Sequence, residues 1–173
     1  RLKYVRNQIT NQQFEEIQIY DMSIMLREGY DEARAKQMET VLETQKEALL
    51  PVWEGSMDIT TEEGTKAITV VSGKQMEQIK IFVNMHTLKG ENLAPPTPGE
   101  AVTSYKTAEN LGIQIGDTVE LTDEDFKTIK VKISGIMQNF VFNYLYMHPE
   151  TYEEYMGKAP EYNNLYLNVV EGT

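Results

Sequence analysis

The chain has 173 residues, of which 40% are hydrophobic, and this is enough for one sizeable domain or two small subdomains. Its 16 Lys and Arg against 27 Asp and Glu give a net charge of -11, which argues against binding to nucleic acid and against electrostatic docking on anionic lipid. The absence of cysteine excludes disulfide and thiolate chemistry, and no window approaches the roughly 20 apolar residues that span a bilayer.

The first third of the chain predicts two helices around one strand. Residues 4–9 are helical in character, and the apolar positions between 17 and 26 indicate a strand. A helix is predicted over residues 32–47, because its apolar side chains form one stripe, and Pro51 is expected to end it.

The middle of the chain predicts a hairpin, a short helix and a linker. Strands are expected at residues 52–60 and 66–72, since Glu62-Glu63-Gly64 between them is a hairpin signal. A short helix is expected at residues 75–82. The run Ala94-Pro95-Pro96-Thr97-Pro98-Gly99 is the clearest linker, because its prolines lack backbone donors and favour extended backbone.

The last part of the chain predicts a small β unit followed by a helix and a strand. A strand at 101–104 precedes a helix at 106–111 that Gly112 ends, and alternating strands follow at 118–121 and 129–133. Gly135 is expected to break the second of these, at a bulge or bend. Pro149 suits the first position of a helix that runs to residue 156, before a last strand at 165–169. We therefore predict a mixed α/β lobe of residues 1–94 and 145–173, with a small β subdomain of residues 95–144 inserted into it.

A search for chemical motifs finds none that supports catalysis. His148 stands before Pro149, where capping a helix is its ordinary role, and His86 lies near a strand end. Asp123-Glu124-Asp125 lacks the alternating ligands and glycine of a calcium loop, so a solvated turn is expected. No Gly-x-Ser-x-Gly elbow or phosphate loop is present. The sequence thus predicts no catalytic residue, no metal site and no cofactor.

The sequence contains one run of alternating aromatic residues that could form a functional surface. Phe140, Phe142, Tyr144 and Tyr146 alternate, so an extended chain would place them on one face. They fit a strand that is buried on both sides. They also fit a partly exposed surface for a partner protein or a lipid-like cargo, and Phe140, Phe142 and Tyr144 are its candidate residues.

Two stretches carry a family resemblance. Residues 99–121, with the turn from Leu111-Gly112 to Gly116-Asp117, and residues 131–152 together resemble the extracytoplasmic domain of FtsX-like, MacB-type permeases of ABC transporters. Residues 13–21 add a weaker likeness. The family typically has a His-Tyr pair where this chain has Asn143-Tyr144, so no role that needs the histidine is carried over. In that family the domain lies outside the membrane, between two transmembrane helices.

The resemblance implies an α+β, two-lobed domain of the MacB-like periplasmic-core type, which is not an enzyme. It would couple ATP hydrolysis by a separate cytoplasmic subunit to export, extraction or signalling, through contacts with cargo or partner proteins. The partners implied are the rest of the permease, its ATP-binding subunit and an extracellular protein or lipid-like cargo, with a dimer only in the full transporter. The expected location is the extracytoplasmic side of the cell membrane, as a soluble fragment from a Gram-positive bacterium. Two alternatives stay open: a secreted or surface binding module, and a stand-alone enzyme that uses carboxylates.

Overall fold

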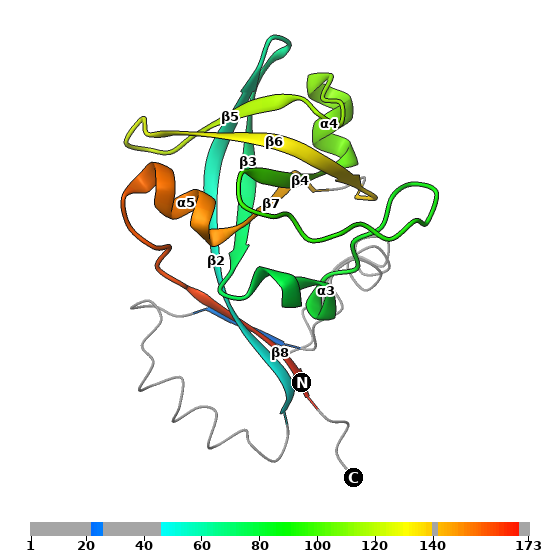
Figure 1. The fold of residues 1–173 in the computed structure, drawn as a ribbon, viewed down its shortest axis with the longest axis vertical. Helices are drawn as coiled ribbons and strands as arrows, with labels where there is room; N and C mark the ends of the chain where they lie inside the picture. The colour runs from blue at the N-terminus through cyan, green and yellow to red at the C-terminus, as the bar shows by residue number, and fades with distance from the viewer. Residues whose placement is uncertain (1–21, 26–45, 140–141, 170–173) are drawn as a thin grey trace.

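The computed structural model of the chain describes residues 22–25, 46–139 and 142–169, and these form a mixed sheet with a few short helices (Figure 1). The expected helix at residues 4–9, most of the one at 32–47, and Phe140 lie outside the described residues. The elements in chain order are β1 (Met22–Met25), β2 (Lys46–Thr61), β3 (Gly64–Gly73), the 3-10 helix η1 (Met76–Gln78), α3 (Ile79–Phe82), β4 (Glu100–Ser104), α4 (Tyr105–Leu111), β5 (Thr118–Thr122), β6 (Thr128–Met137), β7 (Tyr144–Met147), α5 (Pro149–Met156) and β8 (Asn164–Val169).

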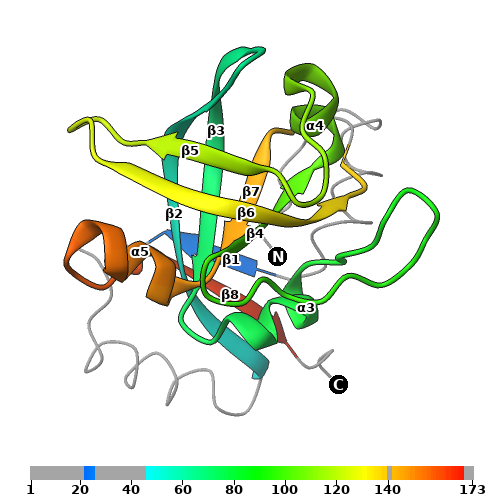
Figure 2. The ribbon, with the colours of Figure 1, turned by 45° about the horizontal axis from the view of Figure 1, so that its top comes forward.

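The sheet closes on itself. Its described strands run in the order β1-β8-β2-β3-β7-β4-β6-β5, and β5 pairs back onto β2. Six strands, from β2 round to β5, therefore form a ring, and β8 and β1 continue the sheet beyond it (Figure 2). The 16-residue β2 belongs to both parts, because its first half pairs with β8 and its second half pairs with β5.

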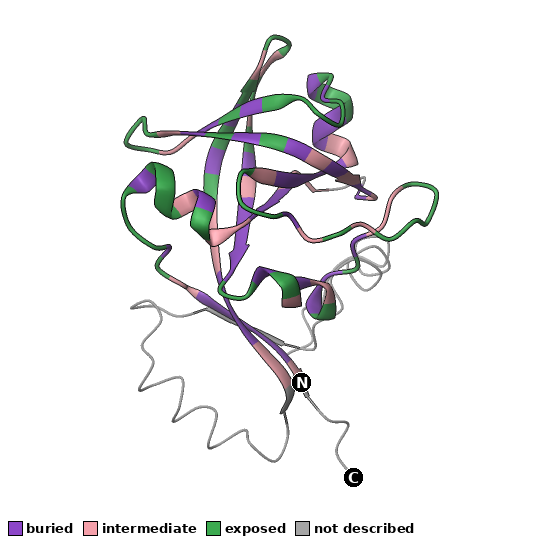
Figure 3. Ribbon diagram, in the orientation of Figure 1, coloured by how far each residue is buried: buried purple, intermediate pink, exposed green. Residues whose placement is uncertain are grey.

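The main hydrophobic core lies inside the ring of strands. Every second residue of β6 is buried, and Ile129, Val131 and Ile133 belong to this core (Figure 3). Helices α4 and α5 add Leu111 and Met156 to the same cluster. The period-2 pattern of the sequence thus becomes a packed interior.

A second core lies outside the ring, under η1 and α3. It joins Ile79 and Phe82 of that helical segment to Val71 of β3, Tyr146 of β7 and Tyr166 of β8. Strand β7 separates the two cores, because the side chains next to Tyr146 in the sequence belong to the interior cluster. The strand is therefore buried on both faces over these residues.

Several local predictions are confirmed. Gly112 and Gly157 end α4 and α5 in the left-handed conformation, with φ of 62° and 76°. Pro149 is the first residue of α5, and the Nδ1 atom of His148 accepts the Glu150 backbone N–H at 3.1 Å. His148 is thus a helix cap, as the sequence indicates.

Two local predictions are wrong. The helix predicted to run through Glu47 and stop at Pro51 is instead strand from Lys46 onward. Proline fits there because its carbonyl accepts the Lys74 N–H at 2.9 Å, so its ring nitrogen faces the β3 side, where ladder pairing begins only at Val52. Gly135 also does not end its strand, since β6 continues to Met137; the expected bulge is present as a register shift opposite β4.

The boundary between the two predicted lobes passes through a single continuous sheet. β5 and β6 of the 95–144 segment pair with each other, and β5 also pairs with β2 of the 1–94 segment. β7 crosses the predicted boundary between residues 144 and 145, and it pairs with both β3 and β4. Any lobes must share this sheet, and the boundary at residues 94 and 95 stays a prediction.

Candidate functional site

Three described aromatic residues of the alternating run follow one another along one side of the chain, and two of them, Phe142 and Tyr144, are candidate surface residues. The rings of Phe142 and Tyr144 lie 5.8 Å apart, and those of Tyr144 and Tyr146 lie 6.2 Å apart. Tyr146 is only 1% exposed and belongs to the outer core, whereas Phe142 and Tyr144 are half-buried. The two candidate residues are thus more exposed than Tyr146, and Phe142 precedes β7 rather than forming part of it.

Hydrogen bonds fix the segment that carries Phe142. The backbone carbonyl of Asn143 accepts the Thr69 N–H at 3.0 Å, and its side-chain Oδ1 accepts the Thr107 hydroxyl at 2.9 Å. The Phe142 N–H donates to Oδ1 of Asn139, which is itself buried, at 2.9 Å. These bonds join β3, α4 and Asn139, which follows β6, to the backbone of Phe142 and the peptide and side chain of Asn143, and the bond from Thr69 belongs to the parallel pairing of β3 with β7.

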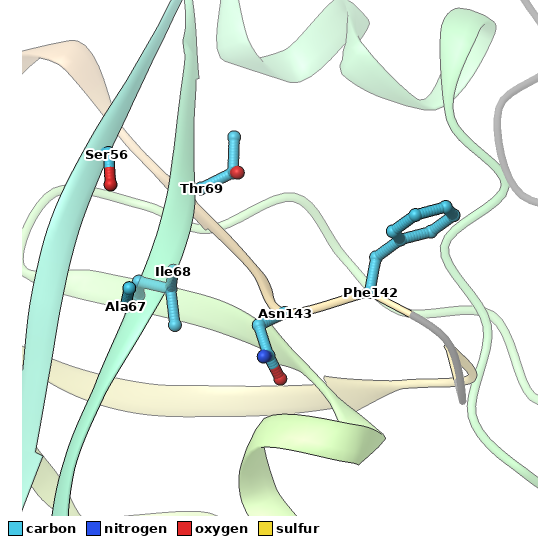
Figure 4. Close-up of a pocket in the computed structure, with 6 residues that line it drawn as sticks. All are labelled: Ser56, Ala67, Ile68, Thr69, Phe142 and Asn143. Atoms are coloured by element: carbon cyan, nitrogen blue, oxygen red, sulfur yellow. The ribbon is translucent and has the colours of Figure 1, made fainter.

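A shallow pocket of about 280 Å³ lies beside this segment. Figure 4 shows Ser56, Ala67, Ile68 and Thr69 on the two paired strands and Asn143 and Phe142 on the segment beside them, with the Phe142 ring turned away from the strands. Its lining residues come from β2, β3 and the segment before β7, and they are Ser56, Ala67, Ile68, Thr69, Phe142 and Asn143. None of them titrates in the physiological range, so the pocket suits apolar contact and neutral hydrogen bonding rather than acid–base chemistry.

Glu54 is a titratable group that the sequence did not single out. It is half-buried, and burial raises the pKa of its carboxyl, while a hydrogen bond from the Tyr166 hydroxyl lowers it. The Asn163 side chain also binds the Glu54 backbone, accepting its N–H at 2.9 Å and donating to its carbonyl at 2.8 Å. A lone glutamate between Trp53 and Gly55 belongs to no sequence motif. Its burial follows from the fold, which brings Tyr166 of β8 and Asn163 against it.

The described part of the chain holds no cluster of three or more His, Asp or Glu side chains that suits a metal ion. Across the same residues, the helices are too short or too polar to pass through a bilayer. The rings of the predicted surface residues Phe142 and Tyr144 lie next to each other, and Phe142 lines a pocket that no sequence pattern indicated, whereas Tyr144 packs against the outer core.

Comparisons with known proteins place the fold. No family model matches the sequence, and no curated protein matches it significantly. Among solved structures, the extracellular domain of the noncanonic ABC-type transporter YknZ from Gram-positive bacteria matches with a TM-score of 0.61 at 14% identity, over 91% of this chain and 84% of that one. The periplasmic region of MacB from Actinobacillus actinomycetemcomitans matches with a TM-score of 0.58 at 11% identity, over 92% of this chain and 79% of that one.

This likeness establishes the α+β fold of MacB-like extracytoplasmic domains. The resemblance stated from residues 99–121 and 131–152 is confirmed at the level of the fold.

Proposed function

We propose that this chain is the extracytoplasmic domain of an ABC transporter permease of the FtsX-like, MacB type, and that it has no catalytic activity of its own. The observation that carries the proposal is the shared fold, which covers nine-tenths of this chain in two domains from such transporters. Fold alone does not fix function, so the site must supply the rest of the argument.

The site adds a surface for contact. Phe142 and Tyr144 have half-buried rings, Phe142 lines a shallow pocket, and hydrogen bonds anchor the backbone of Phe142 and Asn143. Aromatic side chains that are already ordered lose little entropy on binding and supply a large contact area. We place the contact with cargo or a partner protein here, and the domain would pass its effect to a cytoplasmic ATP-binding subunit through the rest of the permease.

The location is tested with the full-length protein. We expect it to fractionate with membranes, to expose this domain to protease added outside the cell, and to co-purify with an ATP-binding subunit. A full-length protein that is released free into the medium would instead support a secreted binding module. A free cytoplasmic protein would contradict both.

The surface is tested by comparing Phe142→Ala with Phe82→Ala. Phe82 is 0% exposed, so its truncation should destabilise the domain by about 3–5 kcal/mol. Phe142 is half-buried, so its truncation should cost clearly less in a urea unfolding experiment. Within the full transporter, Phe142→Ala and Tyr144→Ala should impair transport-dependent growth at normal permease abundance. Normal growth with both variants would remove this surface from the proposal and leave the location untouched.

A further inference from the structure

An exposed aromatic residue lies in the turn between β5 and β6. Phe126 is 87% exposed, and its φ of 61° lies in the left-handed region that phenylalanine rarely adopts. Both ribbon views show this turn projecting from the body of the sheet, above α5 (Figures 1 and 2).

Asp123 holds this turn in one shape. Its Oδ1 atom accepts the backbone N–H of Asp125 at 2.9 Å and of Lys127 at 2.8 Å. Its carbonyl accepts the Phe126 N–H at 3.1 Å, and its own N–H donates to the Lys127 carbonyl at 3.0 Å. The exposed ring therefore projects from an ordered turn, so less backbone freedom would be lost on binding.

A group of aromatic residues lies on helix α5 and on strand β2. The rings of Trp53 and Tyr152 are 4.9 Å apart and both are half-buried, while Tyr155, one turn along α5 from Tyr152, is 42% exposed. Gly55 makes room for the tryptophan, since a Cβ atom there would come within 2.3 Å of the indole ring. This aromatic group is thus formed by residues of both β2 and α5.

The turn and the helix share one electrostatic environment. Both ribbon views show the turn above α5, and burial, with the charges of Asp123 and Glu161, raises the pKa of Tyr152 on that helix (Figures 1 and 2). Residues 123–127 and 149–161 carry seven carboxylates against two lysines. The acidic aromatic surface, defined as Phe126, Trp53, Tyr152 and Tyr155 with these carboxylates, therefore pairs large apolar contacts with negative charge.

We propose that the acidic aromatic surface docks a basic segment of a partner polypeptide, which places an apolar side chain against the rings and its cations among the carboxylates. Aromatic residues dominate the energy of protein interfaces, and opposite charge fixes the partner class. Anionic lipid and nucleic acid would be repelled. A second copy that used this same face would bring like charges together.

This surface is separate from the Phe142 pocket, and its test needs only the isolated chain. Failure here would therefore leave the proposed transporter role standing, and failure of that role would leave this surface standing.

The experiment uses Trp53, the single tryptophan of the chain, as the reporter. The probe is a tryptophan-free synthetic peptide of alternating Lys and Leu residues, titrated against the 173-residue chain while indole fluorescence is followed. We expect saturable binding that weakens with added salt. Phe126→Ser and the double variant Glu153→Lys with Glu154→Lys should each weaken it about tenfold.

The matched control is Ile115→Ser, which removes a side chain that is 64% exposed before β5, at the other end of that strand from Phe126. It should bind the probe as the parent chain does, and circular dichroism should show all variants folded. Equal binding of a Glu–Leu counterpart peptide, equal loss in the control, preferential binding to phosphatidylglycerol vesicles, or no saturable fluorescence change would each overturn the proposal.

Discussion

Glu54 shows at the residue scale how burial couples the fold to pH. Burial raises the pKa of its carboxyl above the ordinary value of a glutamate, so the folded chain holds this proton more tightly than the unfolded chain does. The stabilising contribution is fully present below the unfolded pKa and is lost as the pH rises through the folded pKa. The free energy of unfolding is therefore lower at neutral pH than at acid pH through this group.

We therefore expect Glu54→Gln to raise the melting temperature at pH 7 and to change it little at pH 4, because the amide oxygen still accepts the Tyr166 hydroxyl but carries no charge. Melting curves at both pH values check this. The matched control is Glu124→Gln at an exposed position, which should give no such pH dependence. A gain for Glu54→Gln that is equal at both pH values would contradict the assignment.

Single residues could be predicted from the sequence where their role is local. Gly112, Gly157 and His148 act within one helix turn, and each takes the predicted role. Glu54 and Phe126 could not be predicted in this way. The first depends on the β8 strand, which is distant in the sequence, and the second on a turn that Asp123 shapes.

At the scale of elements, short strands and helices with a clear period were predicted well, and segments with mixed signals were not. The alternation in β6 is confirmed by burial, and the helix predicted at residues 106–111 is confirmed as α4. The sequence predicts helix at the start of β2, because the residues before Pro51 favour helix. They form a strand instead because they pair with β8, which is distant in the sequence. Of the described aromatic residues, Phe142 precedes the strand, because its N–H bonds to the side chain of Asn139 and not to a neighbouring strand.

The turn between β5 and β6 offers a prediction at this scale. A left-handed conformation costs an ordinary residue about 1–2 kcal/mol, and asparagine tolerates it much better than phenylalanine. Because Phe126 is 87% exposed, Phe126→Asn gives up little buried area. We expect it to raise the free energy of unfolding by up to about 1 kcal/mol, measured in urea.

The contrast is Phe126→Ser, which keeps the positive φ and should gain less. Both variants should lose affinity for the basic probe peptide. A destabilised Phe126→Asn chain would show that the ring is packed in solution, contrary to its exposed position.

Over the whole molecule, the sequence indicated the class of fold but not the closure of the sheet. The α+β class and the MacB-like resemblance could be stated from residues 99–152. The pairing of β5 with β2, and the parallel pairings of β3 with β7 and β4 with β6, join strands that are distant in the sequence, so local patterns do not determine them. The candidate pocket was missed for the same reason, since its walls come from β2, β3 and the segment before β7.

These pairings predict how the chain responds to a cut between Lys89 and Gly90. Both residues are exposed in a turn that is closed by backbone bonds between Thr87 and Glu91 and between Gly90 and Thr87. The first fragment would hold β2 and β3, and the second would hold β4 to β8, so the closed ring needs strands from both. With a specific protease site inserted there, we expect the cleaved chain to elute as one species and to melt in a single transition.

The control for the cut is the same inserted chain before cleavage, which should elute at the same volume and melt somewhat higher, because cleavage adds chain entropy to the unfolded state. Lobes that fold independently would instead melt in two transitions, or the fragments would separate. A single transition would mean that the predicted lobes of residues 1–94 with 145–173 and of residues 95–144 unfold together. In that case a load applied to either region would be borne by the shared strands β2 and β7, which pair with strands of both segments.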